Sequence, residues 1–181
     1  MANVLTGNIW NCDSFGIISE RPVLVKAVAF HPADVTNVLT LKWWNEATPT
    51  LVARNITWTV TTSTDNTVTA TTSAFPSTWL DGNVVRCLRD SASTNNRIYG
   101  LIQTAGNDTR FVTWGAPFTN QTASTGDWDC FPSYTAFTVT GATLADSHET
   151  KWFPFGGEGF WFPNLAIDYL STSATAIIYV G

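Results

Sequence analysis

The sequence predicts an all-β fold, an antiparallel β-sandwich or a jelly-roll-like domain with little or no helix. Three observations lead to this prediction. Threonine, valine, isoleucine and aromatic residues, which suit a half-buried pleated surface, dominate nearly every segment. Short apolar or alternating runs recur at intervals of roughly 8–12 residues, separated by turn residues. An apolar period of 3.6 residues, which would indicate a helix, occurs in no segment.

The predicted strands follow in order along the chain. Residues 22–30 form an apolar run with one charge, which suits a core strand, and His31-Pro32 ends it. Gly106-Asn107-Asp108 predicts the turn of a hairpin, and Gly126-Asp-Trp-Asp predicts another turn. One helical turn is allowed near residues 76–80 or 144–148. The predicted strands cover residues 22–30, 38–44, 51–60, 67–72, 84–88, 97–103, 110–114, 134–140, 159–161, 166–170 and 175–180.

Composition excludes several classes of protein. The chain has 181 residues, a formal net charge of −5 and only 13% charged residues. Nucleic-acid binding requires Lys and Arg to neutralise phosphates, and anionic membranes require a basic segment, so neither partner is expected. Disorder does not fit the 13% aromatic content. A helical bundle or coiled coil is not expected either, because those are built from Ala, Glu, Lys, Leu and Arg. The start of the chain lacks the features of a signal peptide. We expect the three cysteines, Cys12, Cys87 and Cys130, to be buried free thiols in a chain folded in a reducing cytoplasm.

Catalytic and metal-binding patterns are weak. The two histidines, His31 and His148, lie in expected loops, and no nucleophile signature accompanies them. Asp127 and Asp129 flank Trp128, but their turn-like surroundings favour backbone capping over acid–base work. Asp127, Asp129, Asp146 and Glu149 lack the spacing of a calcium loop. The sequence therefore predicts no enzyme, no catalytic residue, no cofactor and no metal.

A resemblance comes from the two ends of the chain. Met-Ala-Asn-Val-Leu-Thr-Gly-Asn-Ile-Trp at residues 1–10 resembles the opening of small structural proteins of tailed bacteriophages, with Ile9 in place of the usual proline. The run Val-Leu-Val-Lys-Ala-Val at 23–28 and the ending Ile-Ile-Tyr-Val at 177–180 are similar to strands of that family. The match covers residues 1–53 and 152–181. The resemblance implies a virion head or neck component, and one domain over 1–181 with an insertion or elaboration over 54–151.

Aromatic residues suggest where such a protein makes contacts. There are nine tryptophans, and residues 152–162 are dense in aromatic rings. Three interpretations remain open: a sandwich core that needs large side chains, a subunit interface, and a platform that stacks on sugars. Residues 3–10 are uncharged and are expected to pack against another chain, with a tryptophan as anchor. The predicted interface residues are Asn3, Val4, Leu5, Trp10, Trp152 and Trp161.

The expected function is therefore that of a virion structural protein. It would be a capsid decoration or cement protein, made in the host cytoplasm and bound to the capsid surface. Its partners would be the major capsid protein and copies of itself in a homo-oligomer, with no nucleic acid and no membrane. The alternatives are a tail or fibre module that binds host carbohydrate, and another head or neck component.

Overall fold

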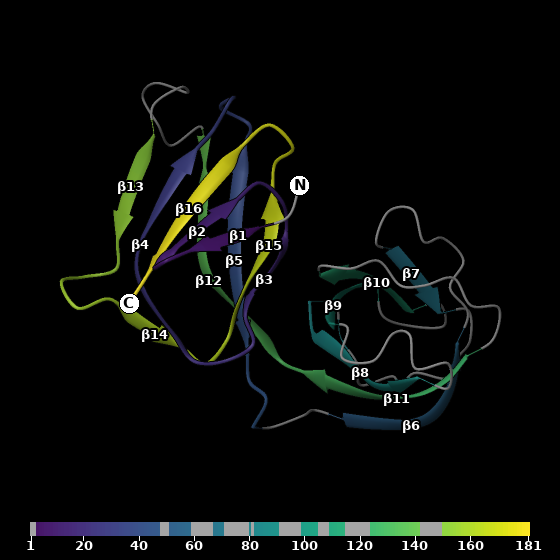
Figure 1. Ribbon diagram of the computed structural model, residues 1–181. Coiled ribbons are helices and arrows are strands. Elements are labelled where there is room, and N and C mark those ends of the chain that lie inside the picture. The colour runs from purple at the N-terminus through teal and green to yellow at the C-terminus, as the bar shows by residue number, and fades with distance from the viewer. Residues whose placement is uncertain are drawn as a thin grey trace. The chain divides into compact units, whose positions relative to one another are not determined.

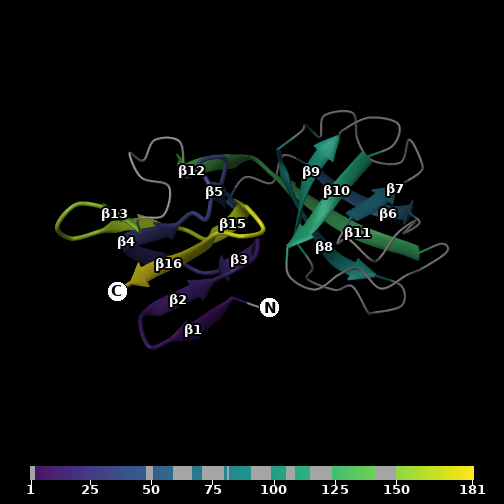
Figure 2. The same ribbon diagram turned by 90° about the horizontal axis from the view of Figure 1, so that it is seen from above.

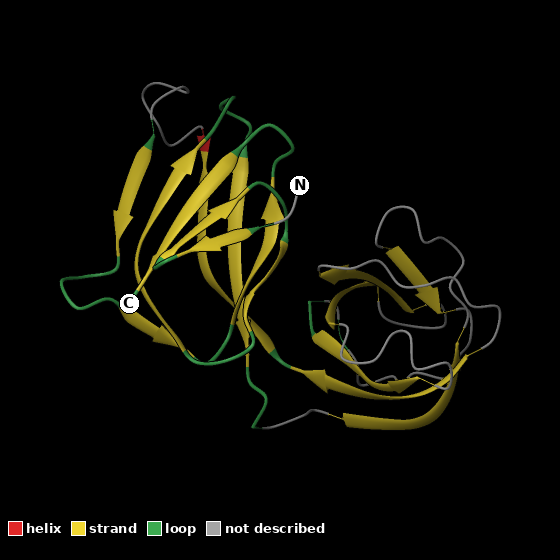
Figure 3. Cartoon of the chain, in the orientation of Figure 1, coloured by secondary structure: helices red, strands yellow, loops and turns green. Residues whose placement is uncertain are grey.

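The computed structural model describes residues 3–47, 51–58, 67–70, 80, 82–90, 99–104, 109–114, 124–141 and 150–181. The predicted all-β fold is confirmed: the described residues form strands and no α-helix, and strand pairs of known register are antiparallel (Figure 3). The strands are β1 (Val4–Thr6), β2 (Ile9–Cys12), β3 (Gly16–Ser19), β4 (Val23–His31), β5 (Val38–Trp44), β6 (Leu51–Trp58), β7 (Thr67–Ala70), β8 (Val84–Asp90), β9 (Tyr99–Thr104), β10 (Thr109–Trp114), β11 (Ser124–Phe131), β12 (Ser133–Thr140), β13 (Lys151–Pro154), β14 (Phe160–Phe162), β15 (Leu165–Leu170) and β16 (Thr175–Val180).

The chain divides into two compact units. Unit 1 consists of Met1–Trp43 and Tyr134–Gly181, and unit 2 consists of Trp44–Ser133. The sequence had instead predicted one domain with an elaboration over 54–151. The structural boundaries lie elsewhere because β12 lies next to β5 in unit 1, whereas β6 pairs with β11 in unit 2 (Figure 1). The resemblance did not extend to β12, so sequence comparison alone left it in the insertion.

The strands that the structure describes in unit 1 form a sandwich of two sheets. Sheet A has the strand order β1-β2-β16-β4-β13, with β14 also paired to β4. Sheet B has the order β12-β5-β15-β3. Alternate side chains of both sheets form a single core, which includes Phe30 of β4, Leu41 of β5 and Ile178 of β16. Each sheet therefore has one face against this core and one face directed away from it.

The described strands of unit 2 form one sheet, with the order β6-β11-β8-β9-β10-β7. The predicted turn at residues 126–129 is wrong, because these residues belong to β11, which pairs with both β6 and β8. The register of β11 shifts between Gly126 and Trp128, so the glycine–aspartate signal marks a β-bulge inside a strand rather than a turn. The helical turns allowed at 76–80 and 144–148 lie outside the described residues, apart from Leu80.

Candidate interaction face of the sandwich

Strand register places two rows of side chains on the face of sheet A directed away from the core. Opposed residues in a sheet share a face, and Phe30 and Ile178 point into the core, so their strand neighbours point outward. We call these two rows the outer face. One row contains Trp152, Ala29, Ile177, Asn11 and Val4, and the other contains Pro154, Ala27, Tyr179, Ile9 and Thr6.

The outer face is uncharged and largely apolar. Its two rows contain no Asp, Glu, Lys or Arg. Trp152 and Val4 are more than half exposed, whereas Ala27 and Ala29 are buried despite facing outward. Trp152 lies opposite Ala29 and Tyr179 lies opposite Ala27. The two ring centroids are 4.7 Å apart, so the rings cover the small alanine side chains between them. An exposed apolar surface of this kind is typical of a site that contacts another molecule.

Trp161 extends the outer face near the start of β4. It lies opposite Leu24, whose neighbour Val25 points into the core, so Leu24 and Trp161 face outward. The Trp161 side chain is 62% exposed. The preceding turn is fixed by Gly159 at φ 85° and by Lys26, whose Nζ donates to the Glu158 carbonyl over 2.7 Å. The turn thus holds this tryptophan beside the outer face.

The N-terminal segment forms an edge hairpin of its own sheet. β1 pairs with β2, and β2 pairs with β16, so β1 is the edge strand visible beyond β2 in Figure 2. Within the described chain, β1 has no strand on its other side. Asn3 precedes β1, and its Oδ1 accepts a hydrogen bond from Ser14 Oγ at 3.3 Å. The expectation that this segment contacts another chain stays a prediction.

The six predicted interface residues do not share one surface. Val4, Trp152 and Trp161 belong to the outer face or its extension. Leu5 pairs with Trp10, and Trp10 pairs with the buried Ile178, so both lie on the core side of sheet A. Trp10 is partly buried and packs against the core, whereas Leu5 is half exposed. Sequence alternation could have separated the two sets only if the pairing of β1 with β2 had been known.

A hollow of about 520 Å³ lies at the β1–β2–β16 end of sheet A, lined by Val4, Asn11, Asp13 and Ile177 among others. One side-chain oxygen of Asp13, Oδ1, is buried and has no hydrogen-bond partner among the described residues. Burial, and secondarily the charge of Asp13, raise the pKa of the neighbouring Cys12 thiol to about 12. Sequence analysis gave no sign of this hollow, because it depends on β16 pairing with β2.

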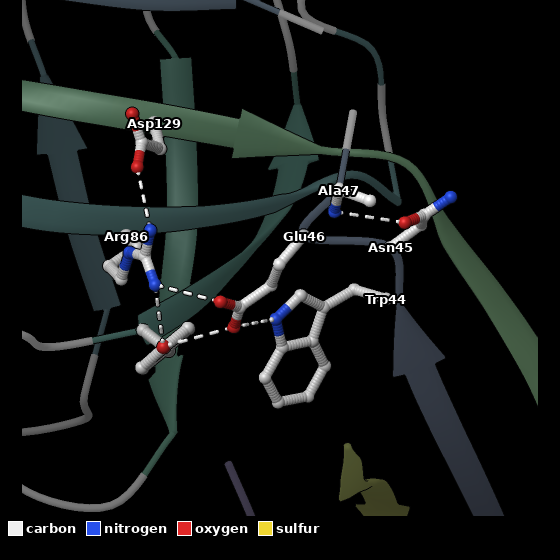
Figure 4. Close-up of polar contacts among 7 residues, drawn as sticks. Trp44, Asn45, Glu46, Ala47, Arg86 and Asp129 are labelled. Atoms are coloured by element: carbon white, nitrogen blue, oxygen red, sulfur yellow. Dashed lines mark hydrogen bonds and ion pairs between the residues drawn. The ribbon is translucent and has the colours of Figure 1, made fainter. Parts of the chain in front are cut away.

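Unit 2 contains a polar network around Arg86 that sequence analysis missed (Figure 4). Arg86 Nη2 donates to Asp129 Oδ2 at 2.8 Å, and Nη1 donates to Glu46 Oε2 at 3.0 Å. The Tyr99 hydroxyl and the Trp44 indole donate to Glu46 Oε1 at 3.2 and 2.9 Å. Burial alone would lower the pKa of Arg86, but hydrogen bonds to Asp129 and Tyr99 and the charge of Glu46 raise it.

Both terminal nitrogens of Arg86 are paired within the protein, and the network has the character of a structural ion pair. The guanidinium lies between two carboxylates and 4.9 Å from the Phe131 ring centroid. Its members are far apart in sequence: Arg86 is separated from Glu46 by 40 residues and from Asp129 by 43. The network therefore joins the beginning, middle and end of unit 2.

Among the described residues, the catalytic and metal-binding candidates do not come together in a recognisable site. The His31 ring Nδ1 lies 2.5 Å from Thr150 Oγ1, an exposed contact with a hydroxyl. Asp127 and Asp129 are buried in β11, and Asp129 pairs with Arg86. Asp146, His148 and Glu149 lie outside the described residues. Among the residues that the structure describes, no group of three His, Cys, Asp or Glu could hold a metal ion. The three cysteines are buried and none of them forms a disulfide.

Comparisons with family models, curated proteins and solved structures give no match for this chain. In the described part of the chain, no helix has the length and apolar character needed to cross a bilayer.

Proposed function

We propose that this chain is a virion structural protein of a tailed bacteriophage, a capsid decoration or cement protein. In this proposal it binds the mature head through the outer face of sheet A. The observation that carries the proposal is the uncharged outer face with the exposed rings of Trp152 and Trp161. Tryptophan is enriched where proteins bind one another, and such a face in water favours association. The resemblance of residues 1–10 to phage structural proteins supports the same role.

The mechanism requires no chemistry. A protein that binds the mature shell, and not its dissociated subunits, stabilises the shell by mass action. Rigid β-sheets suit this role because their exposed side chains hold fixed positions. Copies of the chain around a symmetric shell would each contribute the same contact, with the major capsid protein and with one another as partners.

The test is a binding assay with expanded heads of the same phage. We expect the double variant Trp152→Ser/Trp161→Ser to bind heads at least tenfold more weakly than the original protein, while keeping its fold. Tyr169→Ser is the matched control, because Tyr169 is 54% exposed but lies on β15 of sheet B. Equal head binding by the double variant and the original protein would overturn the proposal. Labelled protein seen by electron microscopy at the neck would instead indicate another head or neck component.

Carbohydrate binding by a tail or fibre module is a second candidate. The observation that favours it is the exposed Trp152 ring in one row with the exposed Asn11 amide, because protein sites for sugars combine an aromatic surface with polar groups. Titration with host-surface glycans, followed by tryptophan fluorescence, would detect it. A glycan response that Trp152→Ser abolishes, together with unimpaired head binding by that variant, would favour this candidate over the first.

A further inference from the structure

One row of the outer face contains both a projecting ring and a hollow. The row crosses sheet A through the register partners Trp152, Ala29, Ile177, Asn11 and Val4. At one end, Trp152 is 54% exposed, and its ring leans over β4 to meet Tyr179 on β16. At the other end, Val4, Asn11 and Ile177 line the hollow of about 520 Å³. The row therefore has a bulky side chain on one side of the sheet and open space on the other.

The central strand β16 lies midway between the ring and the hollow. β4 and β13 follow β16 on one side, and β2 and β1 follow it on the other. The Trp152 ring lies over β4, one strand from β16. The hollow is lined from β1, β2 and β16, so it lies over β2, one strand from β16 on the opposite side. Among the described residues that line it, none belongs to sheet B, so the hollow opens on the outer face.

This arrangement makes the outer face complementary to itself. A two-fold axis parallel to β16 and just above the face places β4 of one copy over β2 of a second copy. The same rotation brings the Trp152 ring of each copy to the hollow of the other, and it brings Ile177 opposite its own equivalent. Sheets that pack face to face often keep their strand directions within about 30° of each other, and an axis parallel to the strands meets this condition.

Charge also favours a second copy as the occupant of this face. The chain has a net charge of −5, so two copies repel one another in most orientations. The two rows of the outer face contain no Asp, Glu, Lys or Arg, so copies that meet here bring no charged rows together. Asp13 lines the hollow beyond the end of β2, and the rotation leaves the two copies of Asp13 on opposite sides of β16.

The size of the face fits a reversible dimer. Five strands about 4.8 Å apart span roughly 24 Å, and the two rows with the Trp161 extension cover about 20 Å along the strands, which gives on the order of 500 Å² per copy. The total of about 1,000 Å² is at the lower limit of specific protein interfaces. Such an interface is typical of association in the micromolar range and not of a permanent dimer.

We propose that the protein forms a two-fold dimer through the outer face of sheet A, in which the Trp152 ring of each copy fills the hollow of the other. The dimer covers the apolar face while the protein is free in solution. It does not depend on the proposed function. Replacement of the second copy by the capsid does rest on that function, and it makes head binding compete with dimerisation.

The experiment is sedimentation equilibrium of the full chain at increasing concentrations. We expect the mass to rise from that of one chain to that of two, with a dissociation constant in the micromolar range. Trp152→Ser should raise this constant at least tenfold. Asn11→Trp should do the same, because the new ring occupies the hollow from within the chain. Tyr169→Ser is the matched control and should leave the constant unchanged, because Tyr169 is 54% exposed but lies on β15 of sheet B.

Charge exchange at the axis tests the geometry of the dimer. Ile177 lies on the central strand and meets its own equivalent, so Ile177→Lys and Ile177→Asp should each be monomeric because like charges meet there. An equimolar mixture of the two variants should form a dimer with one copy of each, because the charges then pair. Circular dichroism shows whether each variant keeps its β-sheet.

A single-chain mass at every concentration, or a mass above that of two chains, would overturn the dimer. Unchanged dimerisation of Trp152→Ser and Asn11→Trp would overturn it as well, whether or not the Ile177 variants fold. A mixture of folded Ile177 variants that stays monomeric would overturn the two-fold axis. These outcomes are separate from the test of function. A monomer that binds heads keeps the proposed function, and a dimer that binds no heads removes that function alone.

Discussion

The rings of Trp152 and Tyr179 meet across β4, with their centroids 4.7 Å apart. β13 and β16 flank β4, and the two residues opposite on β4 are Ala29 and Ala27. Both alanines are almost fully buried although they face away from the core. Small residues on the central strand thus let two large rings approach and cover it. On this part of the outer face the two aromatic rings are packed against one another rather than exposed separately.

We predict that Trp152→Ala has a small effect on stability. The Trp152 side chain is about half exposed, so its removal should lower the free energy of unfolding by about 1 kcal/mol. Phe30→Ala, in the core of the same sheet, should cost about 3–5 kcal/mol. Urea unfolding followed by circular dichroism measures both. A loss of more than 3 kcal/mol for Trp152→Ala would show that the ring is part of the core.

Replacing Arg86 should destabilise unit 2. Arg86→Met leaves Glu46 and the largely buried Asp129 without their cation, which we expect to cost about 3 kcal/mol. Arg21→Met removes the same charge from an exposed position and should change stability by less than about 0.5 kcal/mol. Thermal unfolding of the two variants gives the comparison. Equal stabilities would mean that the network contributes nothing measurable.

The turn before Trp161 should depend on one of its glycines more than the others. Gly159 has φ 85°, and a Cβ there would lie 2.6 Å from the Val25 carbonyl oxygen. Gly156 has φ 73° but open space around a Cβ, and Gly157 has open space and no positive φ. Stability should therefore fall most in Gly159→Ala, by about 1 kcal/mol in Gly156→Ala, and least in Gly157→Ala. Denaturant midpoints of the three variants would rank them, and any other order contradicts the assigned conformation.

Cys12 should make the protein less stable at alkaline pH. Burial raises its pKa from 9.0 to about 12, so between these values the folded protein binds a proton that the unfolded chain has lost. Stability contributed by the neutral thiol is therefore full below pH 9 and falls as pH rises. The decline should be about 1.4 kcal/mol per pH unit steeper than in Cys12→Ala. Unfolding at a series of pH values measures the two slopes, and parallel slopes would refute the shift.

Unit 1 should fold without unit 2. β5 and β12 are neighbours in sheet B, and Trp43 stacks on Tyr134 with ring centroids 4.5 Å apart. Because the two ends already meet, an Asn-Gly turn in place of residues 44–133 should close a hairpin. We expect a β-sheet circular dichroism spectrum and cooperative unfolding. A disordered product would show that unit 1 requires the inserted residues.

Strands with strong local signals were predicted from sequence, and strands defined by distant partners were not. The apolar runs at 22–30, 38–44 and 175–180 correspond to β4, β5 and β16. β1, β2 and β3 are short, and β1 and β2 depend on one another and on β16, at the other end of the sequence. β11 was missed because Gly126 and two aspartates resemble a turn unless Arg86 is known to pair with Asp129. The outer face also depends on pairing between distant strands. Sequence analysis therefore named Val4, Trp152 and Trp161 but did not group them with the other residues of this face.

The position of β16 sets an order of assembly during synthesis. It is the last of these strands in sequence, yet it lies between β2 and β4 in sheet A. The ribosome therefore releases β2 and β4 long before the strand that joins them, whereas the strands of unit 2 all emerge within residues 44–133. Contacts between nearby residues form faster than contacts across the whole chain. Unit 2 should therefore fold on the nascent chain before β16, the central strand of sheet A, has been synthesised.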